Sequence, residues 1–373
     1  MINRTKLGES KKRFEQWGWR QAKKIRTQIH ELNYFFWEAT LKCNLNCRHC
    51  GSDCTKDEKL PELPAEKVLE VFSDIAQNYK PQDIMVAVTG GEPLVRKDLF
   101  DILDDVNQLG FPWGMVTNGM LVDEKVVGKC ITAGMKTVSV SLDGNAHTHN
   151  WLRKNENSYK KAINALKLFV EAEKFDTVEA ITCVYPGNID HLNELYETIQ
   201  AIGIQSWRLF TIFPKGRALD DKALLMTPNL LMKLFSFIKE KRQQSDCVHI
   251  NYCEEGYLGR TWEKEVRDDF FYCGAGINIA GLLCDGTYSA CPSLSKNWAQ
   301  GHIDALSFSE AWETKYANMR NRDWMKGGSC TKCKEWKNCQ GSSLHLWDWE
   351  LGRPKMCHYH LLDSIKEETN VFY

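Results

Sequence analysis

The stretch Cys43-Asn-Leu-Asn-Cys47-Arg-His-Cys50 decides how the rest of this chain is interpreted. It follows an apolar run, residues 34–37, which predicts a buried strand, so its three thiols lie on a loop at the C-terminal end of that strand. Three cysteines cannot all pair as disulfides, because one is left over. Three thiolates can instead hold three irons of a cubane 4Fe–4S cluster and leave the fourth iron open for chemistry. The alternative is a zinc or buried-thiol loop, although zinc sites usually combine two cysteine pairs.

The composition bears on the class of protein and its compartment. The 373 residues carry a net charge of −1, so we expect no overall attraction to nucleic acid or to membranes. No apolar run approaches the ~18–20 residues of a membrane span, and residues 1–28 are too polar and basic for a signal peptide. Fifteen cysteines in such a chain predict metal-bound thiols in a reducing cytoplasm rather than a secreted disulfide framework.

Between residues 33 and 218, short apolar runs alternate with helical patterns, which predicts βα units around a parallel sheet. The predicted strands are 33–40, 83–88, 112–117, 137–142, 177–184 and 206–212, and the predicted helices begin near Pro64, Lys97, Asp123, Ser158 and Ile189. About six units fit, fewer than the eight of a closed barrel. The predicted fold class is therefore α/β, a partial (β/α)6 barrel of the TIM type, with its site at the C-terminal ends of the strands.

A second motif, Thr89-Gly90-Gly91-Glu92-Pro93, follows the second predicted strand. Alone it is also a good turn sequence. Together with the C-x3-C-x2-C loop, in which His49 precedes the last cysteine, it resembles the radical S-adenosylmethionine (SAM) superfamily. The resemblance implies an open six-stranded barrel whose free iron chelates the amino and carboxylate groups of SAM. It further implies that one electron cleaves SAM to methionine and a 5′-deoxyadenosyl radical, which abstracts hydrogen from a substrate.

The same resemblance implies SAM contacts from the glycine motif and the third strand. Gly90 and Gly91 let the backbone approach the ligand, and Glu92 offers a carboxylate to the SAM amino group. Asn118, in a Thr-Asn-Gly sequence, lies near the cofactor, and a simple Asn-Gly turn is the open alternative. His49 is counted among the cofactor-binding residues for its place in the cysteine loop.

The fourth strand ends in the stretch 139–144, Ser-Val-Ser-Leu-Asp-Gly, followed by Arg153. It is similar to the S-L-D-G…H-D-x-x-R stretch of peptide-modifying members, except that position 150 is Asn. The resemblance implies that Ser141 and Arg153 contact the SAM carboxylate, which suits a guanidinium. It places Asp143 near the ribose or the substrate. A surface arginine at a helix start is the alternative for Arg153.

Two basic segments have no settled role in the sequence. Residues 1–32 predict a basic amphipathic helix, for which we favour a cap at the barrel bottom with a solvated face over a docking surface for an acidic peptide or a membrane. Arg217, in a Gly-Arg-Ala sequence after the sixth strand, resembles the barrel-closing segment of the same enzymes. It is either structural or faces the substrate.

The C-terminal part of the chain is rich in cysteine, glycine and tryptophan, has little core of its own, and is expected to need metal to order it. The run Cys330-x2-Cys333-x5-Cys339, then Cys357, resembles the SPASM extension, which carries auxiliary 4Fe–4S clusters. We expect these four thiols to hold one complete cluster. Structural zinc is the alternative on spacing alone.

A second auxiliary cluster is less complete in the sequence. Cys273 and Cys291, the latter in a Gly-x4-Cys sequence, fit the other half of the SPASM pattern, but Ser343 stands where that pattern has a further cysteine. The second cluster therefore needs a ligand such as Cys284 or Cys253, has an open iron, is smaller, or is absent.

The domain organisation that follows is an N-terminal helix (1–32), a radical SAM partial barrel (33–218), a connector with a helix over 228–242 (219–246) and a SPASM domain (247–373). The resemblance implies an enzyme that abstracts hydrogen from a peptide or protein substrate, with an auxiliary cluster accepting an electron. It also implies an external one-electron donor of the flavodoxin or ferredoxin type. Pro292 counts against sulfatase maturation, where an Asp follows the cysteine that matches Cys291.

Two other functions stay open in the sequence. One is an iron–sulfur or zinc scaffold without catalysis, although an intact SAM pocket would be of no use to it. The other is the oxidation of a small molecule such as a sugar or a porphyrin, in which case the tryptophan-rich C-terminal half would line a closed pocket.

Overall fold

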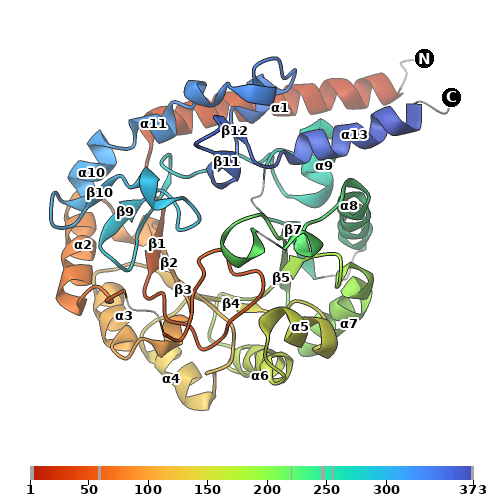
Figure 1. The fold of residues 1–373 in the computed structure, drawn as a ribbon. Coiled ribbons are helices and arrows are strands. Elements are labelled where there is room, and N and C mark those ends of the chain that lie inside the picture. Colours follow the sequence, from red (N-terminus) through yellow and green to blue (C-terminus); the bar gives the residue numbers. More distant parts are fainter. Residues whose placement is uncertain (1–3, 58–59, 220, 245–247, 254–255, 371–373) are drawn as a thin grey trace.

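The computed structural model describes the chain except residues 1–3, 58–59, 220, 245–247, 254–255 and 371–373 (Figure 1). Its centre is a ten-stranded sheet in the order β10-β9-β8-β1-β2-β3-β4-β5-β6-β7. The six predicted strands form the middle of this sheet and run parallel to one another. They are β1 (Tyr34–Glu38), β2 (Met85–Thr89), β3 (Trp113–Thr117), β4 (Thr137–Ser141), β5 (Thr177–Val184) and β6 (Ser206–Thr211). The predicted α/β class and partial barrel are confirmed.

Helices on the outer side of these strands complete the βα units, as Figure 1 shows. They are α2 (Ala65–Asn78), α3 (Leu99–Gln108), α4 (Glu124–Thr132), α6 (Ser158–Glu171) and α7 (Leu192–Ile202). A further short helix, α5 (Ala146–Arg153), lies between β4 and α6 and brings Arg153 to the first cavity described below. Helix α6 begins at the predicted residue, whereas a 3-10 turn, η3 (Ile189–His191), precedes α7 where the sequence predicted the helix to start.

Two further parallel strands extend the barrel beyond the prediction. β7 (His249–Tyr252) pairs with β6, and β8 (Ile279–Leu282) pairs with β1 on the opposite edge. Both come from the segment predicted as an auxiliary domain, so C-terminal residues cover both edges of the six-stranded core. Each strand has only four residues, which is too short for a period to show in the sequence.

The remaining elements belong to the connector and the C-terminal part. Helix α8 (Pro228–Arg242) confirms the predicted connector helix. The others are α9 (Gly259–Val266), β9 (Thr287–Ser289), β10 (Gly301–His302), α10 (Phe308–Thr314), α11 (Ala317–Arg320), α12 (Trp336–Cys339), β11 (Trp347–Asp348), β12 (Arg353–Pro354) and α13 (His358–Asn370). Short 3-10 turns are η1 (Pro81–Asp83), η2 (Pro93–Val95), η4 (Gly216–Ala218), η5 (Lys222–Leu224), η6 (Lys296–Trp298), η7 (Asp323–Met325), η8 (Gly328–Cys330) and η9 (Leu344–Leu346).

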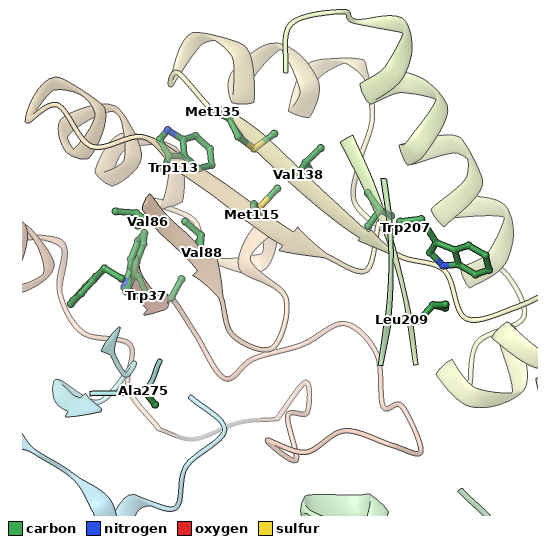
Figure 2. Close-up of a cluster of buried hydrophobic side chains, with 14 of the residues drawn as sticks. Trp37, Val86, Val88, Trp113, Met115, Met135, Val138, Trp207, Leu209 and Ala275 are labelled. Carbon is green, nitrogen blue, oxygen red and sulfur yellow. The ribbon is translucent and has the colours of Figure 1, made fainter. Parts of the chain in front are cut away.

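The largest hydrophobic cluster among the described residues runs through the barrel and into the C-terminal part. Trp37, Trp113 and Trp207 are fully buried between strands and helices, and Figure 2 shows them around the sheet. The ring of Phe308, from α10, packs edge-on against Phe35 of β1 with centroids 5.0 Å apart. The C-terminal part thus buries apolar side chains by packing on the barrel. The expectation that this part has little core of its own did not consider packing on the barrel.

The predicted N-terminal helix is α1 (Arg4–Ile29). In Figure 1 it lies along the C-terminal elements, and its contacts agree. Arg20 donates from Nη1 to Oδ1 of Asn338 at 2.8 Å, and Gln16 donates to the hydroxyl of Tyr257 at 2.9 Å. The sequence favours a cap at the barrel bottom, whereas these contacts place α1 against the C-terminal part. A docking surface for an acidic peptide or a membrane stays the alternative.

No helix in the described ranges combines the length and the apolar character that a membrane crossing requires.

Candidate active site

The cysteine loop closes over the C-terminal end of β1. The backbone N–H of Cys43 donates to the carbonyl of Thr55 at 3.0 Å, which folds the loop back on itself. Burial raises the pKa of the Cys43 thiol to about 11, and the neighbouring thiols of Cys47 and Cys50 act in the same direction. All three cysteines line one cavity of about 220 Å³. The predicted ligand set is therefore brought together on one wall.

The glycine motif after β2 is fastened to the start of this loop. Gly91 donates its N–H to the carbonyl of Thr40 at 2.8 Å, and Glu92 donates its N–H to the carbonyl of Lys42 at 3.0 Å. A Cβ on Gly90 would lie 2.2 Å from the Thr40 oxygen, and one on Gly91 would lie 2.3 Å from the Lys42 oxygen. Gly90 also has a φ of 143°. Glycine is therefore required at both positions for the motif to reach the loop, and both glycines line the cavity.

The Glu92 side chain points into the protein rather than into the cavity. It is fully buried, and its carboxylate accepts hydrogen bonds from the Thr117 hydroxyl and the Asn118 N–H, each at 2.8 Å. Burial raises the pKa of Glu92 to about 7, although these two hydrogen bonds oppose the shift. The carboxylate therefore ties the end of β2 to the end of β3. Its predicted contact with the SAM amino group stays a prediction.

Asn118 and Ser141 line the cavity, and their predicted places beside SAM stay predictions. The side-chain amide of Asn118 donates to Oδ1 of Asn44, in the cysteine loop, at 2.8 Å. Asn118 thus links the end of β3 to the loop between Cys43 and Cys47, which a simple Asn-Gly turn would not require. Asn118 therefore forms part of the cavity wall, and its place near the cofactor stays a prediction.

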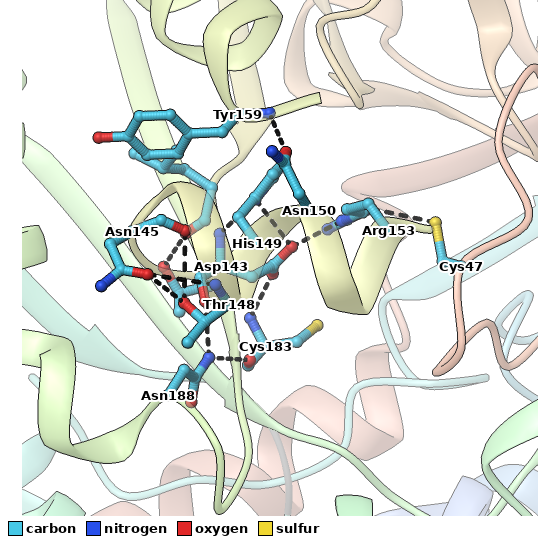
Figure 3. A network of polar contacts seen from close by, with 12 residues as sticks. Cys47, Asp143, Asn145, Thr148, His149, Asn150, Arg153, Tyr159, Cys183 and Asn188 are labelled. Carbon is cyan, nitrogen blue, oxygen red and sulfur yellow. Dashed lines mark hydrogen bonds and ion pairs between the residues drawn. The ribbon is translucent and has the colours of Figure 1, made fainter. Parts of the chain in front are cut away.

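Arg153 and Asp143 form a buried ion pair beside the cavity (Figure 3). Nε of Arg153 donates to Oδ2 of Asp143 at 2.6 Å, and Nη1 lies 3.9 Å from Sγ of Cys47. Burial alone would raise the pKa of Asp143, but the charges of Arg153 and His149 outweigh it and hold the pKa at about 2. Arg153 lines the cavity and is only 9% exposed, so it is not the surface arginine that the sequence left open.

The substitution at position 150 does not affect the cavity. Oδ1 of Asn150 accepts from the N–H of Tyr159 at 2.8 Å, and its amide donates to the carbonyl of Glu156 at 2.7 Å. Asn150 therefore joins α5 to α6, and the departure from the family pattern has a structural explanation.

His49 occupies the wall between the thiols and Asp143. Reactive atoms of His49, Asp143 and Cys183 all lie within 4.8 Å of one another. Burial and then the charge of Arg153 lower the pKa of His49 to about 3, so the ring is neutral. Within the described residues its buried Nδ1 has no hydrogen-bond partner. An unsatisfied polar atom on a cavity wall is expected where a polar ligand belongs.

Two residues that support the loop were not assigned from the sequence. Arg217 donates from Nε to the carbonyl of Cys47 at 2.6 Å, and from Nη1 to Asp53 at 2.7 Å and to the carbonyl of Cys54 at 3.1 Å. Cys54 is buried, lines the cavity, and its thiol hydrogen-bonds Cys50, which lowers the pKa of Cys50 to about 5. Arg217 therefore has a structural role in the cysteine loop, and it also lines the first cavity, so a contact with the substrate stays an alternative. A fourth cysteine in the same loop was the signal for Cys54.

A second cavity, of about 290 Å³, adjoins the first. The two share a wall that includes His49, Gly90 and Arg153. The other walls are largely apolar, with Phe210 and Phe213 among them, and Lys215 contributes a cation. A molecule in this second space would lie beside a ligand held by the cysteine loop.

The C-terminal cysteines form two groups. Burial raises the pKa of Cys357 to about 12, and the nearby thiols of Cys339, Cys330 and Cys333 add to the shift. The four predicted ligands are thus gathered at α12 and at the start of α13.

Cys291 and Cys273 are likewise neighbours, because the Cys273 thiol contributes to raising the pKa of Cys291, after burial, to about 11. Cys284 instead lies against Glu38, to whose carboxylate it donates its N–H at 3.3 Å. Ser343 is buried with a φ of 71°, and its Oγ has no partner among the described residues. Cys284 and Cys253 stay the alternatives that the sequence offers for a third ligand beside Cys273 and Cys291.

The residues around the first cavity fit an iron–sulfur cluster with SAM. Three close thiols provide soft ligands, two glycines leave room that a Cβ would fill, and Arg153 offers guanidinium nitrogens for a carboxylate. The unsatisfied Nδ1 of His49 adds a polar group on the same wall.

Comparisons with known proteins agree with this geometry. Residues 37–199 match the Radical SAM superfamily. The chain is 26% identical over 319 residues to an AdoMet-dependent heme synthase of Methanosarcina barkeri, covering 82% of this chain and 89% of that protein. It is 23% identical over 311 residues to the mycofactocin maturase MftC of Mycobacterium tuberculosis, covering 83% and 77%.

Solved structures share the fold at low identity. Native anSMEcpe with bound AdoMet superposes with a TM-score of 0.69 at 20% identity, over 90% of this chain and 95% of that one. SuiB of Streptococcus suis bound to its precursor peptide SuiA gives 0.67 at 16% identity, over 86% and 74%.

Proposed function

This chain is a radical SAM enzyme that uses SAM and a 4Fe–4S cluster, and on that premise we propose that it abstracts hydrogen from a peptide or protein substrate. When bound, the two cofactors supply the reductive cleavage of SAM to methionine and a 5′-deoxyadenosyl radical. The observation that carries the proposal is the shared wall of the two cavities, because a substrate there would lie beside the cofactor. A scaffold without catalysis is no longer a candidate.

Different residues of the first cavity would bind the cluster and SAM. Cys43, Cys47 and Cys50 would ligate the cluster. Nε of Arg153 bonds Asp143 and Nη1 faces the Cys47 sulfur, so Nη2 is the nitrogen that would bind the SAM carboxylate. Asp143 holds the guanidinium in place and balances part of its charge, which makes it a positioning residue.

The protein also keeps the His49 ring uncharged and limits water at the site. The His49 ring is neutral because it is buried, so it offers a polar contact without a competing charge. Aromatic and aliphatic side chains of the second cavity, such as Phe210, Phe213 and Ile181, exclude water from the space in which a substrate hydrogen would be abstracted.

The second cavity also borders an auxiliary group of thiols. Nζ of Lys215, on the cavity wall, donates to the carbonyl of Ser293 at 2.7 Å, and the N–H of Ser293 lies 3.5 Å from Sγ of Cys291. An auxiliary cluster held by Cys291 and Cys273 would lie at the end of this short path and would supply an electron acceptor close to the second cavity. Cys291→Ala, at the end of this path, should then spare uncoupled SAM cleavage but lose product.

A peptide substrate is supported by relatives in both comparisons. MftC is named a maturase, SuiB has been solved with its precursor peptide, and anSMEcpe with a Cys-containing peptide. The second candidate is a tetrapyrrole, because other sequence relatives are named heme synthase and Fe-coproporphyrin III synthase.

One experiment separates the two substrates. Reconstituted protein, dithionite and SAM are combined anaerobically with either the peptides encoded beside the gene or Fe-coproporphyrin III. We expect a mass change in a peptide and 5′-deoxyadenosine above the substrate-free level. The proposal of a peptide substrate is wrong if only the tetrapyrrole changes mass.

A further inference from the structure

Lys23 is a cation buried where α1 meets the C-terminal part. Lys23 is 6% exposed, and its Nζ has no hydrogen-bond partner among the described residues. Two aromatic rings lie near the ammonium group. Nζ lies 5.7 Å from the ring centroid of Trp19 and 5.9 Å from that of Tyr272. A buried ammonium without an acceptor is costly, because desolvation is not repaid by a hydrogen bond or a counter-ion.

A second buried cation, Arg322, lies beside it. Nη2 of Arg322 donates to the carbonyls of Cys273 and Ala275, each at 2.8 Å, and Nε donates to the carbonyl of Met319 at 2.8 Å. Nη1 is buried and has no partner in the described part of the chain. Two adjacent cations, each with an unused donor, imply that an anion belongs between them.

Contacts place C-terminal cysteines beside this pair. Arg322 donates to the carbonyl of Cys273, the ring near Lys23 belongs to the preceding Tyr272, and α1 bonds Asn338, the residue before Cys339. Burial and then the charge of Arg322 lower the pKa of Lys23 to about 7, and the thiols of Cys339 and Cys273 act in the opposite direction. Those two cysteines come from the two groups of C-terminal thiols. Neutral thiols do not balance two cations, whereas thiolates bound to iron carry negative charge.

We propose that Lys23 and Arg322 are the counter-cations of an anionic iron–sulfur centre whose ligands include Cys339, Cys273 or both, and that α1 thereby raises its reduction potential. This inference rests on the auxiliary cluster of the proposed function. Reduction adds one electron, and so one negative charge, to the centre. A nearby cation stabilises the reduced form more than the oxidised form, and the low-dielectric interior strengthens that effect.

The test isolates the auxiliary centre from SAM chemistry. The full chain with Cys43→Ala, Cys47→Ala and Cys50→Ala is reconstituted, its iron is counted, and its reduction by dithionite is followed by electron paramagnetic resonance against potential. Lys23→Met, added to this background, removes the charge and keeps an apolar side chain of similar length. Lys24→Met, on the exposed face of α1, is the matched control.

We expect Lys23→Met to lower the midpoint potential by about 59 mV, which corresponds to a tenfold change in a one-electron equilibrium. Lys24→Met and Lys23→Arg should leave it close to the background value. Equal potentials for Lys23→Met and Lys24→Met would overturn the inference.

Iron retention gives a second readout. Loss of iron from Lys23→Met with retention in Lys23→Arg would support the inference, because charge is the shared feature, and loss from both would contradict it. A background variant without iron would also contradict it, while SAM cleavage by the unmodified enzyme would still stand.

Discussion

Arg153 and Asp143 are held together at 2.6 Å in a buried ion pair from which the guanidinium reaches to 3.9 Å from the Cys47 sulfur. This pair makes the first prediction. Arg153→Met leaves a fully buried carboxylate without its main counter-charge, so we expect a loss of about 3–5 kcal/mol in the free energy of unfolding and a rise in the pKa of Asp143. SAM binding, measured by equilibrium dialysis, should fall at least tenfold.

Lys154→Met is the matched control, because Lys154 follows Arg153 directly and is exposed. It should change neither SAM binding nor the urea midpoint. Unchanged SAM affinity in Arg153→Met would show that the guanidinium does not contact the cofactor.

The second prediction concerns Arg217 as the support of the cysteine loop. Its guanidinium binds the carbonyls of Cys47 and Cys54 and the carboxylate of Asp53. Arg217→Ala removes all three contacts, so the loop should hold its cluster less firmly, and iron should be lost faster on exposure to a chelator. Lys222→Ala, at an exposed position in the next turn, should lose iron at the rate of the unmodified protein. Equal rates for the two variants would mean that the loop holds its shape without Arg217.

A third prediction uses the close approach at the glycine motif. Gly91→Ala would place a methyl group 2.3 Å from the Lys42 oxygen, so either the glycine motif or the cysteine loop must move. We expect SAM cleavage to fall more than tenfold and the urea midpoint to decrease. Gly128→Ala, in α4, meets nothing within 4 Å and should be neutral or stabilising by up to about 1 kcal/mol. Full SAM cleavage by Gly91→Ala would mean that this contact can relax.

The fourth prediction is a pH dependence that originates at Glu92. Its pKa is raised to about 7 by burial, above the ordinary 4.5, so the folded state keeps a proton that the unfolded state releases. The stability that this proton contributes is complete below about pH 4.5 and is lost as the pH rises through 7, roughly 3 kcal/mol in all. Urea midpoints across this window, compared with those of Glu92→Gln, isolate the effect because other titrating groups cancel. Parallel curves for the two proteins would rule out this assignment.

The local pattern of the sequence predicted the elements whose residues are close in the chain. The period of apolar residues gave β1 to β6 and α8, and the spacing of Cys43, Cys47 and Cys50 gave the loop that lines the cavity. These features depend on neighbours within about ten residues, and strand ends of a parallel barrel meet at one edge.

Local sequence patterns could not predict contacts between residues that are far apart in the chain. Arg217 meets Cys47 across 170 positions, and Arg20 meets Asn338 across 318, so neither local period nor spacing reveals them. The strands β7 and β8 form because they pair with the edge strands β6 and β1. Four residues are too few for the sequence of either strand to predict this pairing. The Glu92 side chain points into the protein because the Thr117 hydroxyl and the Asn118 N–H, at the end of β3, donate hydrogen bonds to it. These donors lie near Glu92 only in the folded chain.

The central claim is that three thiols on one loop hold a cluster able to cleave SAM. The most direct measurement is 5′-deoxyadenosine formed from SAM by anaerobically reconstituted protein under dithionite, for the unmodified chain and for Cys47→Ala. We predict steady formation by the unmodified enzyme and none by Cys47→Ala, whose auxiliary iron should remain. Equal formation by both proteins, or a colourless unmodified protein that contains only zinc, would contradict the account.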